Sequence, residues 1–156
     1  MGNQARKLRK LFAAPGVIRL IGAHNALGAA LGERCGFEGI WSSGFEISTS
    51  HAVPDARILT MSDFLAAGQA MVDAVSVPVV TDCDTGYGGL LNVRHAVRGY
   101  ERAGAAAIQL EDQEFPKKCG HTPGRRVVSA DDMVRKIAVA AEARTSPDFL
   151  IIARTD

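Results

Sequence analysis

Residues 77–88, VPVVTDCDTGYG, decide the fold class of this chain. The first five of them, residues 77–81, are apolar or β-branched and predict a buried strand. The acidic, glycine-rich remainder predicts a loop that begins where the strand ends. A second apolar run, residues 105–110, stops in the same way at Glu111 and Asp112. Acidic groups that follow neighbouring strands indicate parallel strands whose carboxyl ends share one site.

Strand-like runs alternate with helical segments on both sides of this stretch. We expect strands over residues 17–23, 37–41, 77–81, 105–110 and 149–153, and helices over residues 25–35, 60–75, 92–103 and 130–143. Thr60 or Ser62 is the expected cap of the second helix, and Ser129 that of the fourth. The polar stretch over residues 48–54 is too irregular to predict a helix or a strand. Strands separated by helices predict parallel βαβ units.

Two architectures fit this alternation, a doubly wound sheet and a (β/α)8 barrel. The barrel is favoured because functional-looking side chains follow strand after strand, at Ser43, Asp82, Asp84, Glu111 and Arg154. In an open sheet, ligand contacts concentrate at one switch point. A full barrel needs roughly 200 residues or more, and this chain has 156. We therefore expect an α/β chain of the TIM-barrel family, one partial catalytic domain over residues 1–156 with about the first five β/α units, truncated at its C-terminus.

The composition is that of an ordinary globular protein. Hydrophobic residues make up 47% and charged residues 22%, and the formal net charge is +1. This balance gives no reason to expect a nucleic acid or a membrane as partner, and the basic cluster over residues 6–10 indicates a solvated helix face. Three cysteines without a Cys-x-x-Cys pair predict neither a disulfide framework nor a zinc site. Without a signal-peptide pattern or a membrane-spanning run, we expect a cytoplasmic protein.

Asp82 and Asp84 alternate along the chain, so an extended strand would point both carboxyl groups to the same side. Two like charges so close are costly to ionise unless a cation or hydrogen-bond donors lie beside them. A Mg²⁺ ion, bound directly or through water, would relieve this cost, and Glu111 would reach it from the next strand. A solvated acidic turn is the alternative interpretation. We favour a metal site formed by these three residues.

The loop over residues 117–121, KKCGH, contains the candidate acid–base group. Cys119 is flanked by basic residues in a polar, flexible segment, which favours a thiolate or a proton donor over the usual buried thiol. Arg154 ends an apolar strand, where a buried guanidinium needs an anionic partner such as a substrate carboxylate or phosphonate. Ser43 and Gly44 offer hydroxyl and backbone donors for another carboxylate, although Ser-Ser-Gly segments are common in ordinary loops.

Taken together, the segments DCDTGYG (82–88), ED (111–112), KKCGH (117–121) and ARTD (153–156) resemble the isocitrate lyase/phosphoenolpyruvate mutase superfamily. The resemblance covers nearly the whole chain, and the motifs occur in the family's order. It implies a (β/α)8 barrel with a Mg²⁺ site, with Mn²⁺ as an alternative ion. It also implies small 2-oxo acids or related anions as substrates, which react through enolate-type intermediates.

The resemblance further implies roles for individual residues. Asp82, Asp84 and Glu111 are similar to the acidic shell of the metal, and Cys119 is similar to the catalytic acid of the carbon–carbon lyases. The complete expected site comprises catalytic Cys119, Lys117 and His121, substrate-binding Trp41, Ser43, Gly44, Asp55 and Arg154, and metal-binding Asp82, Asp84 and Glu111.

Features of several enzymes within the superfamily are combined in this chain. The segment KKCGH is similar to the loop of lyases that cleave isocitrate, methylisocitrate or oxaloacetate. Residues 39–41 (GIW), 43–46 (SGFE), 52–56 (AVPDA) and 114–117 (EFPK) are more similar to phosphonopyruvate hydrolase and phosphoenolpyruvate mutase. We expect a Mg²⁺-dependent lyase acting on a small 2-oxo or 2-hydroxy carboxylic acid. A hydrolase or mutase acting on a P–C bond and an inactive half-barrel remnant are the alternatives. For a full-length protein, the resemblance implies a homo-oligomer, a tetramer in the family.

Overall fold

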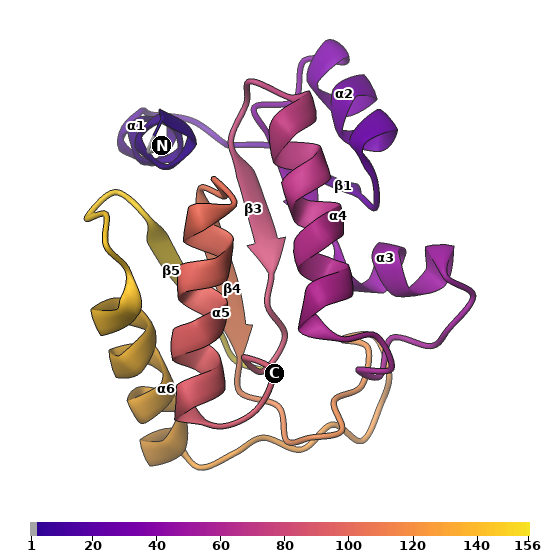
Figure 1. Cartoon of the computed structure of the whole chain (residues 1–156), viewed down its shortest axis with the longest axis vertical. Coiled ribbons are helices and arrows are strands. Elements are labelled where there is room, and N and C mark those ends of the chain that lie inside the picture. Colours follow the sequence, from indigo (N-terminus) through magenta and orange to yellow (C-terminus); the bar gives the residue numbers. More distant parts are fainter. Residues whose placement is uncertain (1–2) are drawn as a thin grey trace.

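The computed structural model describes residues 3–156, which form five strands and six helices (Figure 1). In chain order these are α1 (Asn3–Ala13), β1 (Leu20–Ala23), α2 (Ala26–Arg34), β2 (Gly39–Ser42), α3 (Gly44–Ser50), α4 (Met61–Ala74), β3 (Val79–Asp82), α5 (Leu90–Arg102), β4 (Ala107–Glu111), α6 (Ala130–Ala143) and β5 (Leu150–Arg154). Every strand and helix predicted from the sequence is present, with its ends displaced by three residues at most.

The strands form one parallel sheet in the order β1-β2-β3-β4-β5. Each strand thus pairs with the next one in the chain, with no reversal of order. Right-handed crossovers between such strands place the connecting helices α2, α4, α5 and α6 on the same face of the sheet. A doubly wound sheet would reverse its strand order at a switch point. The predicted α/β barrel winding is therefore confirmed, and the doubly wound alternative is wrong.

Side chains alternate between the two faces of the sheet because successive residues of a strand point to opposite sides. Val79 is fully buried in a cluster with residues of α2 and α4, which identifies the helix-covered face. Val80 and Ala107 belong to a separate cluster on the opposite face. Asp82 and Glu111 follow these two residues at even spacing, so they lie on the face that the helices do not cover. The same alternation therefore forms the core and directs the acidic groups to one place.

Helix α1 packs across the amino-terminal ends of the strands. Leu8 is fully buried in the cluster that contains Val80, while Arg6 and Lys10 on the same helix are exposed. The side chain of Gln4 accepts a hydrogen bond from the backbone N–H of Val79 at 3.1 Å. The predicted solvated helix face over residues 6–10 is confirmed, and the opposite face of α1 closes one end of the sheet.

Helix α3 was not predicted from the sequence. Ser43 caps it, with its Oγ accepting a hydrogen bond from the backbone N–H of Glu46 at 3.2 Å. Ile47 is buried at one turn of the helix and Ser48 beside it. The expectation of irregular structure over residues 48–54 is wrong for the first three of these residues. A seven-residue helix with four hydroxyl side chains in and before it is too short for the apolar spacing that predicts longer helices.

The backbone between Asp82 and Asp84 is not extended, so the condition under which strand alternation would align their side chains is not met. Strand β3 ends at Asp82, and Asp84 has a φ angle of +44°. Asp tolerates this left-handed conformation better than most residues, because its short polar side chain can bond to the nearby backbone. The two carboxyl groups therefore come together through a turn rather than through strand alternation.

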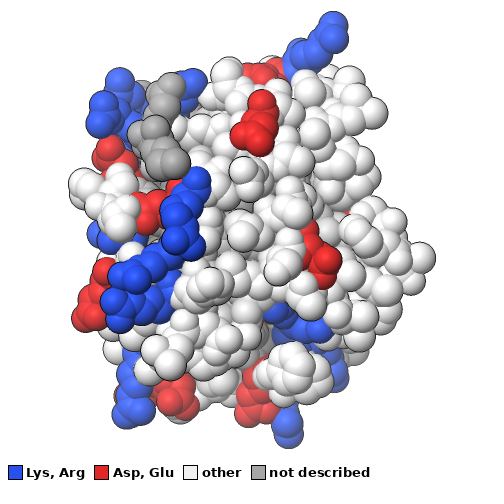
Figure 2. Space-filling model, viewed as in Figure 1, with Lys and Arg blue, Asp and Glu red and all other residues white. Residues whose placement is uncertain are grey.

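The surface on the view of Figure 1 mixes both signs of charge. Lys and Arg side chains gather over the α5 and α6 side of this face, with Asp and Glu among them, and the surface over α4 carries few charges (Figure 2). No helix within residues 3–156 has both the length and the apolar composition needed to cross a bilayer.

Candidate active site

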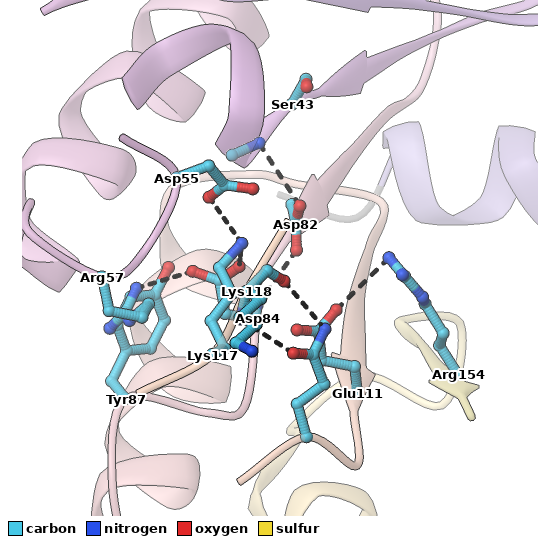
Figure 3. A network of polar contacts seen from close by, with 12 residues as sticks. Ser43, Asp55, Arg57, Asp82, Asp84, Tyr87, Glu111, Lys117, Lys118 and Arg154 are labelled. Carbon is cyan, nitrogen blue, oxygen red and sulfur yellow. Dashed lines mark hydrogen bonds and ion pairs between the residues drawn. The ribbon is translucent and has the colours of Figure 1, made fainter. Parts of the chain in front are cut away.

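Seven charged side chains meet at the carboxyl ends of β3, β4 and β5 (Figure 3). We call this group the charged cluster; its members are Asp55, Arg57, Asp82, Asp84, Glu111, Lys117 and Arg154. Asp82, Glu111 and Arg154 are the last residues of β3, β4 and β5. Asp84 lies in the turn after β3, and the other three members come from the α3–α4 loop and the β4–α6 loop. The sequence prediction placed six of these seven residues in the site.

The turn after β3 fixes the two aspartates against each other. The backbone N–H of Asp84 donates to Asp82 Oδ1 at 3.0 Å, and the N–H of Gly44 donates to Asp82 Oδ2 at 3.3 Å. The backbone N–H of Glu111 donates to the carbonyl oxygen of Asp84 at 2.8 Å. Gly86 makes the turn feasible, because its φ is +87° and an added Cβ would lie 2.5 Å from a Val93 methyl carbon. The DCDTGYG segment thus needs its glycine for both conformation and space.

Lys117 brings a buried positive charge into the cluster. Its Nζ lies 2.5 Å from Asp55 Oδ1 and 2.8 Å from Asp84 Oδ1, and its side chain is 4% exposed. Burial works to lower the pKa of Lys117, but Asp84 and Asp55 outweigh burial and raise it above its ordinary value. The ammonium group therefore stays charged and ties the β4–α6 loop to two other loops.

Arg154 and Glu111 form the other side of the cluster. Arg154 Nη1 lies 3.3 Å from Glu111 Oε2, and Nη2 donates to Asp156 Oδ1 at 2.5 Å. Gly120 of the β4–α6 loop passes so close that an added Cβ would clash with the Arg154 guanidinium. About a third of the Arg154 side chain remains exposed, so the guanidinium can contact an incoming anion.

The carboxyl groups fit a hard divalent cation. Burial, with the neighbouring carboxylates Asp84 and Asp55, raises the pKa of Asp82 to about 7, although part of its surface stays open. Burial, with Asp82 and Asp84, raises the pKa of Glu111 to about 8. Within the described residues, Glu111 Oε1 is buried without a hydrogen-bond partner. Carboxylate oxygens are the ligands that Mg²⁺ prefers, and a bound cation would reverse both pKa shifts.

The same carboxyl groups do not form a ready-made cage of direct ligands. Across residues 3–156, no three His, Cys, Asp or Glu side chains are spaced to hold one ion together. Mg²⁺ often keeps several of its waters and takes only one or two carboxylates directly. The arrangement of Asp82, Asp84 and Glu111 therefore fits an ion held partly through water.

The comparisons with known proteins identify the family. Residues 8–156 match the protein-family model for phosphoenolpyruvate phosphomutase. The chain belongs to the phosphoenolpyruvate mutase/isocitrate lyase superfamily. A 2,3-dimethylmalate lyase from Eubacterium barkeri is 47% identical to it over 155 residues, which make up 99% of this chain and 54% of that protein.

Two solved structures of the superfamily support the same assignment. A phosphoenolpyruvate phosphomutase from Streptomyces platensis subsp. rosaceus is 53% identical and superposes with a TM-score of 0.95, covering 97% of this chain and 53% of that one. A phosphonopyruvate hydrolase in complex with oxalate and Mg²⁺ is 43% identical, with a TM-score of 0.90, over 98% of this chain and 52% of that one. The chain thus spans about half the length of the superfamily members it matches.

Five of the residues predicted from the superfamily resemblance are not members of the charged cluster. Cys119 is half-buried and His121 is exposed, both in the β4–α6 loop, and within residues 3–156 no hydrogen bond joins the Cys119 thiol to an acidic group. Ser43 is used as the cap of α3. Trp41 packs in the apolar cluster with Val80, one layer of side chains below the carboxyl groups. Gly44 contacts the cluster through its backbone N–H.

Arg57 is the member of the cluster that the sequence did not predict. Its Nη1 donates to Asp84 Oδ2 at 2.9 Å, and only 7% of its side chain is exposed. Its guanidinium carbon lies 3.9 Å from the centre of the Tyr87 ring. In the sequence, Arg57 sits between a loop and a helix like any surface arginine. The one available signal was its position two residues after Asp55.

Proposed function

We propose that this chain carries the metal- and substrate-binding residues of a Mg²⁺-dependent lyase. The substrate is a small 2-oxo or 2-hydroxy carboxylic acid, and the reaction proceeds through an enolate. The observation that carries the proposal is the state of Glu111, a buried carboxyl group with one unpartnered oxygen and a pKa raised to about 8 beside Asp82. Mn²⁺ is an alternative ion.

The charge of the cluster supports an anionic substrate. Its four carboxyl groups and three basic groups leave one net negative charge when all are ionised. A divalent cation changes this to one net positive charge, which attracts a carboxylate or a phosphonate. Without the cation, the cluster would repel the same molecule. Binding of the metal therefore favours binding of the substrate, and binding of the substrate favours binding of the metal.

The candidate site residues have the following roles in the reaction. Arg154 binds one anionic end of the substrate, and Ser43 and Gly44 bind a carboxylate at the other. As the C–C bond breaks, the substrate's 2-hydroxyl group loses its proton to solvent and its oxygen becomes the carbonyl oxygen of the 2-oxo product. The electron pair of the broken bond enters the enolate of the other fragment, a carboxylate. When bound, Mg²⁺ stabilises the negative charge that develops on oxygen. The Cys119 thiol then transfers its proton to the carbanionic carbon.

Three further residues support these steps. Lys117 holds Asp55 and Asp84 in place, and its charge offsets theirs. His121 lies two residues from Cys119 and returns a proton to the thiolate from solvent. Trp41 contributes apolar contact from the layer below the carboxyl groups.

We also infer that the protein is a homo-oligomer and that it is located in the cytoplasm.

A second candidate is a hydrolase or mutase that acts on a P–C bond. Its support is the 53% identity to the phosphoenolpyruvate phosphomutase and the 43% identity to the phosphonopyruvate hydrolase. Here Arg154 would bind the phosphonate group instead of a carboxylate. Both candidates use the metal and an enolate intermediate, but the bond that breaks and the fragment that becomes the enolate differ.

Product analysis distinguishes the two candidates. The purified protein is incubated with Mg²⁺ and either 2,3-dimethylmalate, 2-methylisocitrate or oxaloacetate, or with phosphonopyruvate or phosphoenolpyruvate. Proton and phosphorus NMR then follow the products. Cleavage of a C–C bond in one of the three phosphorus-free acids supports the lyase. Phosphate release, or interconversion of the two phosphorus compounds, supports the second candidate. Mg²⁺-independent turnover would overturn the proposed metal dependence. No turnover with any of the five compounds would overturn the proposal and leave the inactive remnant.

A further inference from the structure

We propose that Arg57 is a positioning residue, which fixes the orientation of Asp84 in the metal site and holds the loop before α4 against the strand ends. The inference rests on the proposed function, since it assumes that Asp84 belongs to a metal shell. It assigns a role to a side chain that has no place in the reaction steps above.

The ion pair between Arg57 and Asp84 is almost completely removed from water. The two side chains are 7% and 3% exposed, and the N–O distance is 2.9 Å. The guanidinium lies 3.9 Å above the Tyr87 ring and 5.5 Å from the ring of Phe64. A buried ion pair gives little net stability compared with apolar residues of the same size. The ion pair therefore serves to orient the Asp84 carboxylate, because a planar guanidinium stacked on a ring donates its hydrogen bonds in a fixed direction.

The backbone of all three partners is in a left-handed conformation. The φ angle is +62° at Arg57, +44° at Asp84 and +65° at Tyr87. Such a conformation is energetically unfavourable for a residue other than glycine and persists only where the surroundings hold it. Arg57 contacts both of the others, so these contacts hold three residues in a disfavoured backbone conformation. This pattern is typical of functional sites.

Asp84 is held from two sides by groups of different kinds. Lys117 reaches Oδ1 from the β4–α6 loop, and Arg57 reaches Oδ2 from the loop before α4 (Figure 3). Lys117 also pairs with Asp55, so its single ammonium group is divided between two carboxylates. Within residues 3–156, Arg57 forms an ion pair only with Asp84, and its guanidinium lies over Tyr87, whose hydroxyl bonds to that of Tyr100 at 2.5 Å. Of the two basic residues that bind Asp84, Arg57 is therefore the one that packs against the aromatic core.

Among the described residues that line the cavity behind Arg57, no other basic side chain is placed to pair with Asp84. A cavity of about 720 Å³ lies on the far side of Arg57 and Tyr87, between the starts of α4 and α5 and the β4–α6 loop. The other basic residues that line it are His95 and Lys136, and Lys136 Nζ already donates to the carbonyl oxygen of Thr85 at 3.1 Å. Loss of the guanidinium would connect this cavity to Asp84 and admit water to the carboxylate.

The test compares Arg57→Met and Arg57→Lys with the same two changes at Arg19. Arg19 is a matched control, because it pairs with Glu38 at 2.6 Å and lies over the Phe37 ring at 5.6 Å, but it is exposed and remote from the site. The readouts are the Mg²⁺ dissociation constant from titration calorimetry without substrate, kcat and KM with the substrate found above, and the melting temperature.

We expect Arg57→Met to weaken Mg²⁺ binding about tenfold, as loss of a group that orients a metal ligand commonly does. We also expect kcat to fall by a similar factor with KM nearly unchanged, and Arg57→Lys to recover part of both losses. The Arg19 variants should match the wild type. If Arg57→Met fails to fold, Arg57→Lys carries the same comparison.

The outcomes separate this inference from the proposed function. A wild-type protein that binds no Mg²⁺ overturns both. A wild type that binds Mg²⁺ and an Arg57 variant that binds it within twofold of the wild type overturns only the role of Arg57. Equal losses in the Arg57 and Arg19 variants would show a general effect of stability and would likewise overturn it.

Discussion

Glu111 and Arg154 are register partners at the carboxyl ends of β4 and β5, and their side chains meet at 3.3 Å between Oε2 and Nη1. The sheet itself sets this distance, since residues paired across neighbouring strands point to the same face. An anion that binds Arg154 is therefore placed directly beside the carboxyl group with the unpartnered oxygen. Backbone register, rather than loop conformation, brings the proposed substrate and metal sites together.

Replacing Arg154 by Gln should weaken substrate binding. A hydrogen bond to a charged group contributes about 1.5–3 kcal/mol, so we expect KM to rise roughly 10- to 100-fold with a smaller change in kcat. Steady-state kinetics measures both. Arg6→Gln is the control, because Arg6 is an exposed arginine that pairs with Asp148 away from the site. A KM that stays at the wild-type value in Arg154→Gln would exclude Arg154 from substrate binding.

Metal-free protein should lose stability as the pH rises from about 5 to about 8. The pKa of Asp82 is about 7 and that of Glu111 about 8, against 3.8 and 4.5 for the free groups. In this window the folded state binds more protons than the unfolded state, so the free energy of unfolding falls with increasing pH. Urea unfolding in EDTA at pH 5, 6, 7 and 8 measures the trend.

The same experiment has two internal controls. Glu111→Gln should reduce the pH slope, because it removes the group with the higher pKa, and saturating Mg²⁺ should abolish or reverse the slope. A stability that is flat or rises over this range in metal-free protein would contradict the raised pKa values.

Replacing Cys119 by Ser should lower turnover far more than substrate binding. General acid catalysis contributes about 10²- to 10⁴-fold, and a serine hydroxyl is a much weaker acid than a thiol. We expect kcat to fall by at least about 100-fold with KM within a few-fold of the wild type. Cys35→Ser provides the control, since Cys35 is an exposed free thiol at the end of α2. Unchanged turnover in Cys119→Ser would mean that another group supplies the proton.

Replacing Gly86 by Ala should destabilise the fold. The left-handed backbone disfavours a side chain, and the added methyl would lie 2.5 Å from Val93 Cγ2. Strain and overpacking together should cost about 2–4 kcal/mol, which chemical unfolding can measure. Gly89→Ala in the same loop should change stability by less than about 1 kcal/mol, because nothing lies within 4 Å of its added Cβ. Equal losses at the two positions would argue against the steric explanation.

The sequence by itself determined the alternation of strands and helices, the family, and the strand ends that carry Asp82, Glu111 and Arg154. These features are local. Apolar runs mark buried strands, and the period of two in a strand fixes which side chains share a face. Helix α3 escaped prediction because it is too short to show an apolar period.

Only the tertiary structure decided which charged groups are buried and paired. Lys117 meets Asp55 across 62 positions of sequence, while its neighbour Lys118 is exposed. Arg57 meets Asp84 across 27 positions. Nothing in the local sequence separates a buried charge from a solvated one, because the free energy of a charged group depends on the partners that distant segments bring to it. For that reason the sequence predicted Asp82 and Glu111 from the strands that they end, but it did not predict Arg57, which pairs with Asp84.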